Sequence, residues 1–333
     1  MDIYIKKKSR INCEHINIPW VEKYRPGTMN DIVLNKFIKT KLLKIIERKV
    51  IPNMIITGEP GTGKTSTVLC LLKEFYQDSM YRENILELNA SDDRGLSIIN
   101  NVIMPFCKKK TDDNQSKIIV MDEADSITTK AQNLLSNILV EQGKKNKFIF
   151  ICNDCSKINE SIQSKCIMIQ FPKLSKSKVK SKILKICELE NIDYDDEGIE
   201  SLLFVSNNDI RVSINNLECI NFSYQKVYKD TVYHFIDKPK PVYIEKIIQF
   251  VLNGKYNESI NIIKDLHSRG YSANDILLTF MNFLLQDKFF LEEEIKLKIY
   301  EIVSLTYIKV NDGIQTLLQL CGCISKIYLY LEK

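Results

Sequence analysis

Short, almost continuously apolar runs alternate with longer stretches in which apolar residues recur every three or four positions. Runs of the first kind predict strands at residues 54–57, 85–88, 117–121, 148–152 and 167–171. Such strands are typically buried on both faces, and the helical segments between them favour a parallel α/β sheet. Ligands of such sheets bind at the carboxyl ends of the strands, where the polar motifs of this chain fall. The pattern therefore predicts a parallel five-stranded sheet with a ligand site at its carboxyl edge.

The strand pattern ends after residue 172, and helical periodicity replaces it over residues 177–189, 199–205 and 210–220. Pro239 and Pro241 then interrupt the chain, because two prolines in four residues exclude a continuing helix. Further amphipathic helices are predicted over residues 244–251, 256–266, 273–285, 292–306 and 312–328. We therefore expect a basic N-terminal extension (1–16), an α/β domain that contains the ligand site (17–172), a small helical domain (173–237) and an all-helical C-terminal domain (238–333).

The composition fits a soluble intracellular protein. Its 333 residues suffice for about two domains, and 44% of them are hydrophobic. No apolar run approaches the roughly 20 residues that span a bilayer, and residues 1–10 lack the apolar centre of a signal peptide. We expect a reducing compartment, in which the ten cysteines are mostly small buried residues. Cys152 and Cys155 have the spacing of a zinc-binding pair, but no second pair of cysteines or histidines accompanies them.

The segment Gly-Glu-Pro-Gly-Thr-Gly-Lys-Thr at residues 58–65 has the sequence of a phosphate-binding loop. A strand leads into it, its glycines let backbone N–H groups close around phosphate oxygens, and a helix over residues 66–76 points its N-terminus at the anion. In such a loop Lys64 reaches the β- and γ-phosphates, and the Thr65 hydroxyl binds Mg²⁺. The predicted nucleotide-binding residues here are Gly58, Glu59, Pro60, Gly61, Thr62, Gly63, Lys64, Thr65 and Ser66.

Two carboxylates, Asp122 and Glu123, end the third predicted strand. Asp122 can hold the Mg²⁺ that Thr65 also binds, and Glu123 can polarise a water for attack on the γ-phosphate. A carboxylate in this place could instead cap the following helix, an alternative that applies more to Asp125 than to Asp122. The phosphate-binding loop upstream favours the role in metal binding and catalysis.

Two single residues could complete this site. Asn153 follows the fourth predicted strand, where it either orients the attacking water or is an ordinary turn residue. Arg211 begins a helix of the small helical domain, where it is either a solvated arginine or a cation that reaches the phosphates. Neither residue is specific evidence by itself.

Further segments carry longer motifs, at residues 18–26 (Ile-Pro-Trp-Val-Glu-Lys-Tyr-Arg-Pro), 86–95 (Leu-Glu-Leu-Asn-Ala-Ser-Asp-Asp-Arg-Gly), 122–125, 152–153, 162–166 and 215–217. Together with the loop they resemble the AAA+ ATPases of the clamp-loader class, and specifically the small subunits of replication factor C. The likeness covers essentially the whole chain and loosens after Val227. Residues 270–272 and 317–320 are most similar to the small subunit numbered two in animals and four in yeast.

The resemblance implies a heteropentameric ring in which the first helical domain is a lid, the C-terminal helical domains form a collar, and ATP lies between subunits. In this family ATP binding lets the ring open the sliding clamp PCNA and grip primer–template DNA, and hydrolysis releases the closed clamp. The resemblance also implies a nuclear protein of DNA replication and repair. It places Val21, Arg25 and Val33 at the nucleotide, and it makes Asn153 and Arg211 the two sensors of the bound phosphates.

Lys165 occupies a position at which the family has an arginine, the finger inserted into a neighbour's ATP site. Such fingers contribute about 10³ to 10⁵ in rate in the systems where they are measured. Lysine keeps the charge but lacks the planar fork that grips phosphate oxygens. We therefore expect Lys165 to sense a neighbour's nucleotide while catalysing weakly.

The family's DNA-facing positions also differ in this chain. The residues found there are Asn100, Val102 and Met104 after Arg94-Gly95, and Ser136, Asn137 and Val140 after the acidic motif. Each lost phosphate contact flattens the salt dependence of duplex binding by a slope of about 0.9. The net charge of +5 is compatible with nucleic acid binding but does not establish it. We expect this subunit to hold DNA less firmly than its ring neighbours.

Other nucleotide-binding classes share parts of the pattern. A DEAD-box helicase needs two tandem α/β domains, whereas the strand pattern here stops at Phe171. A small GTPase would carry an Asn-Lys-x-Asp motif after the loop, and this chain has none. A branch-migration motor of the AAA+ class would not be expected to carry the 20–26 segment. A ring scaffold that binds ATP with little hydrolysis stays open, because Glu123 argues against it and Lys165 partly for it.

Overall fold

The computed structural model describes residues 18–76, 83–92, 95–109, 116–143, 145–236, 238–285 and 292–332. The chain divides into two compact units. Unit 1 contains Met1–Asp193 and Leu202–Gln225, and unit 2 contains Tyr194–Ser201 and Lys226–Lys333. The predicted extension 1–16 and Arg94 lie outside the described residues. The domain boundaries after residues 16, 172 and 237 stay predictions.

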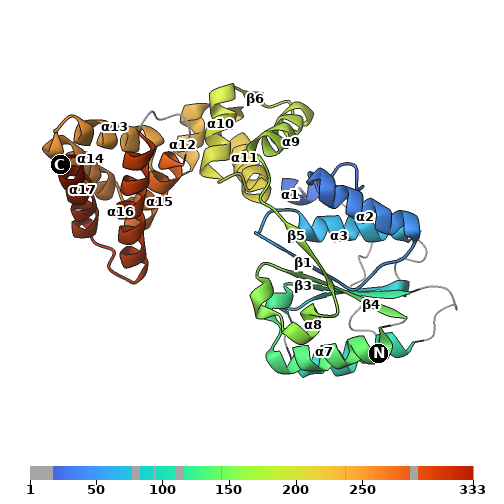
Figure 1. Ribbon diagram of the computed structural model, residues 1–333. Coiled ribbons are helices and arrows are strands. Elements are labelled where there is room, and N and C mark those ends of the chain that lie inside the picture. Colours follow the sequence, from blue (N-terminus) through green and yellow to red (C-terminus); the bar gives the residue numbers. More distant parts are fainter. Residues whose placement is uncertain are drawn as a thin grey trace. The chain divides into compact units, whose positions relative to one another are not determined.

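A five-stranded parallel sheet lies at the centre of unit 1, as the apolar runs predict (Figure 1). Its strand order is β2-β3-β4-β1-β5, and all neighbouring pairs are parallel. The carboxyl ends of β3, β4 and β1 are therefore adjacent, so the loop after β1 lies beside the residues that follow β3 and β4. The strands are β1 (Met54–Gly58), β2 (Ile85–Asn89), β3 (Lys117–Asp122), β4 (Asn146–Cys152) and β5 (Ile167–Phe171).

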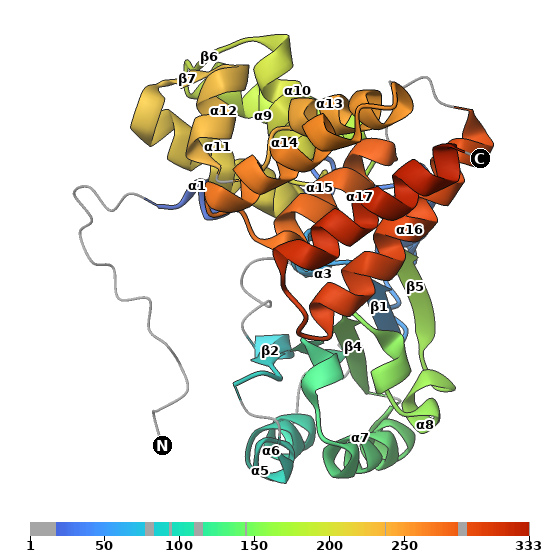
Figure 2. The same ribbon diagram turned by 90° about the vertical axis from the view of Figure 1, so that its left-hand side faces the viewer.

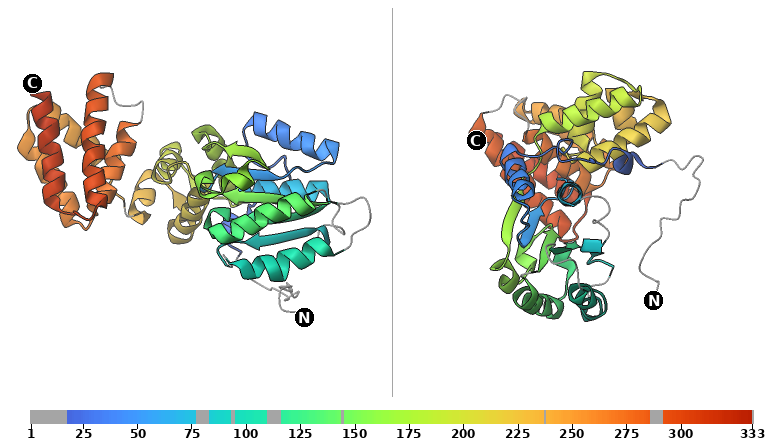
Figure 3. Two further views of the ribbon diagram at one scale, coloured as in Figure 1. Left: turned by 60° about the horizontal axis from the view of Figure 1, so that its bottom comes forward. Right: turned by 90° about the vertical axis from the view of Figure 1, so that its right-hand side faces the viewer.

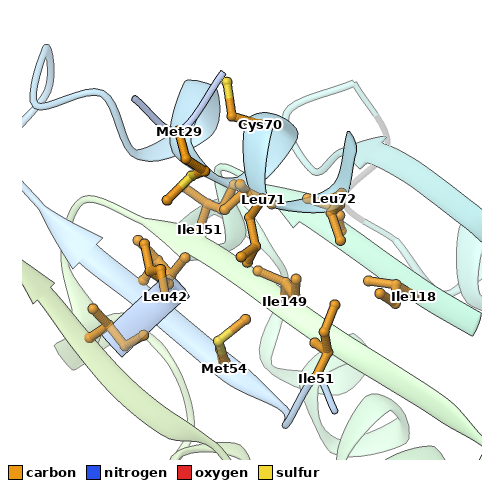
Figure 4. Packing of buried hydrophobic residues seen from close by; sticks show 14 of the residues in the cluster. Met29, Leu42, Ile51, Met54, Cys70, Leu71, Leu72, Ile118, Ile149 and Ile151 are labelled. Atoms are coloured by element: carbon orange, nitrogen blue, oxygen red, sulfur yellow. The ribbon is translucent and has the colours of Figure 1, made fainter. Parts of the chain in front are cut away.

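Helices cover both faces of this sheet, because successive strand residues point to opposite sides. In β1, Met54 belongs to the core on one face and Ile55 to the core on the other. Figure 4 shows the first of these cores, in which Leu71 of α3 lies above Met54 and Ile149. In Figure 1, α2 and α3 lie on one side of the sheet and α7 and α8 on the other. The helices beside the sheet are α2 (Lys36–Arg48), α3 (Lys64–Phe75), α5 (Leu96–Ile98), η1 (Ile99–Ile103), α6 (Met104–Lys108), η2 (Ala124–Ser126), α7 (Thr129–Gln142), η3 (Cys155–Lys157) and α8 (Glu160–Gln163).

Lys117 fixes the α5–η1–α6 segment to the sheet. Figure 2 shows α5 and α6 of this segment beside α7. The lysine is the first residue of β3 and is buried. Its Nζ donates hydrogen bonds to the carbonyl oxygen of Phe106, at 2.7 Å, and to that of Lys109. These acceptors lie at the C-terminal end of α6, where the Phe106 carbonyl also accepts from the backbone N–H of Lys109 at 3.3 Å, so the buried ammonium binds carbonyl oxygens of the last helical turn.

Unit 1 also contains α1 (Trp20–Lys23), α9 (Lys176–Leu189) and α11 (Ile210–Tyr224). α1 packs against α11. α10 (Asp196–Val205) spans the division between the units. A small second sheet pairs β6 (Asp193–Tyr194) with β7 (Lys226–Val227), and it was not predicted because two-residue strands are too short to show a periodic pattern.

Unit 2 contains the predicted all-helical C-terminal region, and Figure 3 shows its helices lying side by side. They share one apolar core, which includes Ile244, Phe280, Val303 and Ile324. Pro241 is the first residue of α13, so the predicted proline break is where a new helix starts. In the parts of the chain that the structure describes, no helix has the length and apolarity to cross a membrane. The helices are α12 (Lys229–Phe235), α13 (Pro241–Leu252), α14 (Tyr256–Ser268), α15 (Ala273–Leu284), α16 (Glu293–Asn311) and α17 (Leu317–Leu331).

Candidate nucleotide-binding site

The loop between β1 and α3 has the backbone that phosphate binding requires. Gly61 and Gly63 have φ angles of 74° and 83°, in the left-handed region that favours glycine. Gly63 is also the residue before α3, and no side chain caps this helix. The first N–H groups of α3 are therefore left for an anion at the positive end of the helix.

Lys64 joins the loop to the end of β4. Its Nζ donates to the carbonyl oxygens of Gly58, at 2.7 Å, and Glu59, at 2.9 Å, and to Oδ1 of Asn153, at 2.9 Å. An ammonium has three donors, so these three bonds use all of them. The side chain is only 8% exposed, and burial lowers the pKa of Lys64. The structure thus brings together Lys64 and Asn153, which the sequence assigns to the same nucleotide.

The acidic motif lies beside Thr65. Thr65 Oγ1 donates to Asp122 Oδ2 at 2.9 Å, and the backbone N–H of Glu123 donates to Asp122 Oδ1 at 2.9 Å. Glu123 has a φ of 53°, a left-handed conformation that costs a non-glycine residue about 1 kcal/mol or more. Hydroxyl and carboxylate oxygens are the ligands that Mg²⁺ prefers, so the Thr65 and Asp122 pair fits this metal.

A cavity of about 370 Å³ lies among these residues. The predicted site residues that line it are Val21, Arg25, Val33, residues 60–66, Asp122, Glu123, Asn153 and Arg211. Gly58 and Glu59 do not line it; their carbonyls hold Lys64, and the Glu59 carboxylate is 3.3 Å from the Lys173 ammonium. Its apolar lining includes Ile32, Leu174 and Ile214, which suits the base of a nucleotide.

Several lining residues were not predicted, among them Asp31 and Lys182. Lys182 lies on α9, and burial lowers its pKa. Its signal in the sequence is indistinct, because it is one of many lysines in the 173–185 segment. Tyr24 and Pro26 also line the cavity, and for these the 18–26 motif was an available signal.

Arg211 reaches the cavity from the first turn of α11, and Asp209 fixes that turn. Asp209 Oδ1 accepts from the backbone N–H groups of Arg211, at 2.8 Å, and Val212, at 3.2 Å. The same carboxylate lies directly against the loop, since a Cβ atom added at Gly61 would be 2.2 Å from Asp209 Oδ1. An aspartate before a helix is a recognisable cap, but the contact with the loop has no local signal.

Lys165 does not line the cavity of its own chain. It follows α8, and its Nζ donates to Ser136 Oγ at 2.6 Å and to the Ser136 carbonyl oxygen at 3.2 Å. Ser136 is buried on α7, whereas Asn137 and Val140 on the same helix are exposed. The structure therefore separates Lys165 from the other predicted catalytic residues and pairs it with a serine that the sequence placed among the DNA-facing positions.

Comparison with known proteins identifies the family. Residues 54–173 match the model of the ATPase family associated with various cellular activities (AAA), and residues 239–326 match the replication factor C C-terminal domain. A putative replication factor C small subunit of Acanthamoeba polyphaga mimivirus is 37% identical over 95% of this chain and 98% of its own length. The chain belongs to the replication factor C small-subunit family.

Replication factor C subunit 4 of Saccharomyces cerevisiae is 36% identical over 94% of this chain and 96% of that protein. This agrees with the predicted likeness to the small subunit numbered four in yeast. The branch-migration motor RuvB of Thermotoga maritima matches with a TM-score of 0.53 over 79% of this chain and 91% of that one. Its identity is 16%, so it shows a shared AAA+ fold and nothing more.

The family membership confirms the predicted enzyme class and role. The protein is an AAA ATPase that binds nucleotide, and it acts as a clamp-loader subunit of a multi-subunit replication factor C complex. The predicted fold is confirmed as well: an AAA domain with a five-stranded parallel sheet is followed by a helical C-terminal domain.

Proposed function

We propose that this chain binds and hydrolyses Mg·ATP within a heteropentameric ring that opens PCNA and closes it around primer–template DNA. The observation that carries the proposal is the convergence of Lys64, Thr65, Asp122 and Asn153 at one cavity, through two hydrogen-bonded pairs. These pairs come from the loop after β1, the end of β3 and the residue after β4. They are the groups that phosphoryl transfer to water requires.

Lys64 and Asn153 change partners when ATP binds. The lysine ammonium exchanges protein oxygens for β- and γ-phosphate oxygens, which carry more charge and make stronger hydrogen bonds. Its Asn153 bond is the one that this exchange can release without disturbing the loop backbone. Asn153 then faces the γ-phosphate and the attacking water, while Arg211 offers a second cation from α11. Asn153 and Arg211 would in this way sense the bound phosphates.

Glu123 is the proposed general base. A water oxygen attacks the γ-phosphorus, the bond from phosphorus to the leaving oxygen of ADP breaks, and the water proton passes to the Glu123 carboxylate. Thr65 and Asp122 would hold Mg²⁺, which neutralises charge on the β- and γ-phosphates. Asp122 also accepts a hydrogen bond from the backbone N–H of Glu123, so the carboxylate that would bind the metal also positions the base.

Lys165 is proposed to act on the ATP of the neighbouring subunit. Its ammonium can approach a γ-phosphate as a point charge but cannot form the two parallel hydrogen bonds of an arginine. To do so it must also leave Ser136. The lack of a planar fork and the bond to Ser136 both lower the contribution of Lys165 to ATP hydrolysis by the neighbouring subunit.

The test uses the assembled ring, because the site is completed between subunits. The chain should co-purify with related subunits and PCNA, and Glu123→Gln should retain bound ATP while releasing little phosphate. Lys64→Ala is the control that removes binding itself. Release of phosphate at the wild-type rate by Glu123→Gln would refute the assignment of the base. Lys165→Arg should raise the rate of the ring and Lys165→Ala should lower it; equal rates for all three would refute a role in the neighbour's site.

An ATP-binding scaffold with little hydrolysis is the second candidate. The observation in its favour is the bond between Lys165 and Ser136, which holds the finger within its own chain and so lowers what this chain contributes to hydrolysis at its neighbour's site. In that case Glu123→Gln would leave the hydrolysis of the ring unchanged although this chain still binds ATP.

Nuclear location is also part of the proposal, and a fluorescent fusion found outside the nucleus of a eukaryotic host cell would contradict it.

A further inference from the structure

The segment from Trp20 to Pro26 lines part of the nucleotide cavity and packs against α11. Its residues Val21, Tyr24 and Arg25 line the cavity. α1 within it has only four residues, too few to be stable alone in water. The position of Val21 and Arg25 at the cavity therefore depends on the contacts that this segment makes with other helices of the chain.

Two carboxylates of α9 and α11 provide that support. Glu218 Oε2 on α11 accepts from the backbone N–H of Trp20 at 3.0 Å. Glu190, the residue after α9, accepts from Lys23 Nζ at 2.5 Å and from the Tyr24 hydroxyl. These bonds hold both ends of α1, because Trp20 is its first residue and Lys23 its last.

The other end of the segment is attached to the helix that carries the phosphate-binding loop. The Cys70 thiol on α3 donates to the Pro26 carbonyl oxygen at 3.1 Å. Glu74 Oε1, also on α3, accepts from the backbone N–H of Met29 at 2.7 Å. The segment thus connects α9 and α11 to α3, and all three helices belong to unit 1.

We propose that Glu190 and Glu218 are positioning residues for nucleotide binding, which hold α1 so that Val21 and Arg25 face the nucleotide. Neither carboxylate lines the cavity, so both act through α1 and not by contact with ATP. The inference rests on the proposed function of the cavity. It adds to that function two residues of the lid, far along the chain from the loop and the acidic motif.

Trp20 supplies a direct readout. It is the single tryptophan of the chain, it is 6% exposed, and its ring lies edge-on to that of Tyr24 at a centroid distance of 6.2 Å. Release of α1 exposes this ring to solvent. Its fluorescence therefore reports the docking of α1 in the unmodified full-length chain.

The experiment measures the affinity for Mg·ATPγS and the quenching of Trp20 by acrylamide in the full-length chain. Glu218→Ala and Glu190→Ala should each weaken ATPγS binding about tenfold, the equivalent of one charge-assisted hydrogen bond, and should increase quenching. Glu218→Gln and Glu190→Gln keep an acceptor oxygen and should bind within about threefold of the wild type, because a neutral hydrogen bond is weaker but still present. The matched control is Glu188→Ala, since Glu188 is exposed on α9 and does not line the cavity.

Any of these outcomes would overturn the inference: unchanged affinity in both alanine variants, a loss no larger than that of Glu188→Ala, or weaker binding without increased quenching. Glutamine variants as weak as the alanine variants would also do so, because retained hydrogen bonding would then be irrelevant. A wild-type chain that binds no ATPγS refutes the proposed function together with this inference. Wild-type binding with unaffected variants refutes only the inference.

Discussion

Gly61→Ala tests the contact between the phosphate-binding loop and the first turn of α11. Gly61 has a φ of 74°, and a Cβ atom there would lie 2.2 Å from Asp209 Oδ1. Gly63 is the matched control, because its φ is 83° and a Cβ atom there would meet nothing within 4 Å. The two substitutions share the backbone strain and differ in the contact with Asp209.

The expected losses in the free energy of unfolding follow from the backbone strain and from the contact with Asp209. Alanine in the left-handed region costs about 1 kcal/mol, which is the whole effect expected of Gly63→Ala on the free energy of unfolding. In Gly61→Ala the Asp209 carboxylate must also turn away and lose the hydrogen bonds by which it caps α11, at a cost of about 1 kcal/mol. Gly61→Ala should therefore destabilise unit 1 by about 2 kcal/mol in total.

Urea unfolding followed by the fluorescence of Trp20 measures this quantity, because the single tryptophan lies in unit 1. In an Asp209→Ala background the cap is already lost and the clash is gone. Gly61→Ala should then cost no more than Gly63→Ala does. Equal costs of the two glycine substitutions in the wild-type background would refute the contact. An excess that persists without Asp209 would show that another atom causes it.

Three other perturbations test side chains around the site. Asn100→Arg adds a charge to an exposed position and should steepen the slope of log affinity against log salt for duplex DNA by about 0.9; an unchanged slope would argue against DNA contact there. Ser136→Ala removes the hydroxyl that holds Lys165 and should raise hydrolysis by the ring up to about fivefold, the worth of one net hydrogen bond; the same rise in a Lys165→Ala ring would count against this cause. Burial raises the pKa of Glu190, but the hydrogen bonds from its two donors outweigh it and leave the pKa below its usual value. The stabilisation from this carboxylate is therefore present above the unfolded pKa of about 4 and is lost as the pH falls through the lower folded value. At that pH the quenching of Trp20 in the wild type should converge on that of Glu190→Gln, whose neutral side chain does not titrate, and a difference between the two that persists there would contradict this account.

The sequence predicts the sheet well because each of its strands is a local apolar run. The expected strands 54–57 and 148–152 correspond to Met54–Gly58 and Asn146–Cys152 in the structure, and the three others end within a residue of their predicted bounds. The loop after β1 is equally local, since its glycines and lysine all fall within residues 58–64. α2 was not predicted, although Asn35 caps it by accepting from the Phe37 N–H group at 3.1 Å. Its lysine-rich sequence obscures an apolar face of which only Ile38 and Leu42 are buried.

The contacts that support the site could not be predicted in this way. Glu218 and the backbone N–H that it accepts from are 198 residues apart, and Glu190 is 167 residues from Lys23. A glutamate on a helix surface has the same local sequence signal whether it is solvated or paired with a distant segment. Asp209 is a further example, because its role as a helix cap can be predicted from the local sequence and its contact with Gly61 cannot.

Four of the residues assigned to catalysis are held by side-chain partners within the chain: Lys64 and Asn153 by each other, Asp122 by Thr65, and Lys165 by Ser136. The first two pairs line the same cavity, so one nucleotide can replace both sets of bonds at once. The third pair does not line it, so in the proposed role of Lys165 a nucleotide on another subunit would compete with Ser136 for the lysine. The occupancy of this chain's own site and the release of its finger are therefore separate events. Changes at Ser136 should alter hydrolysis on the neighbour while leaving the affinity of this chain for ATP unchanged.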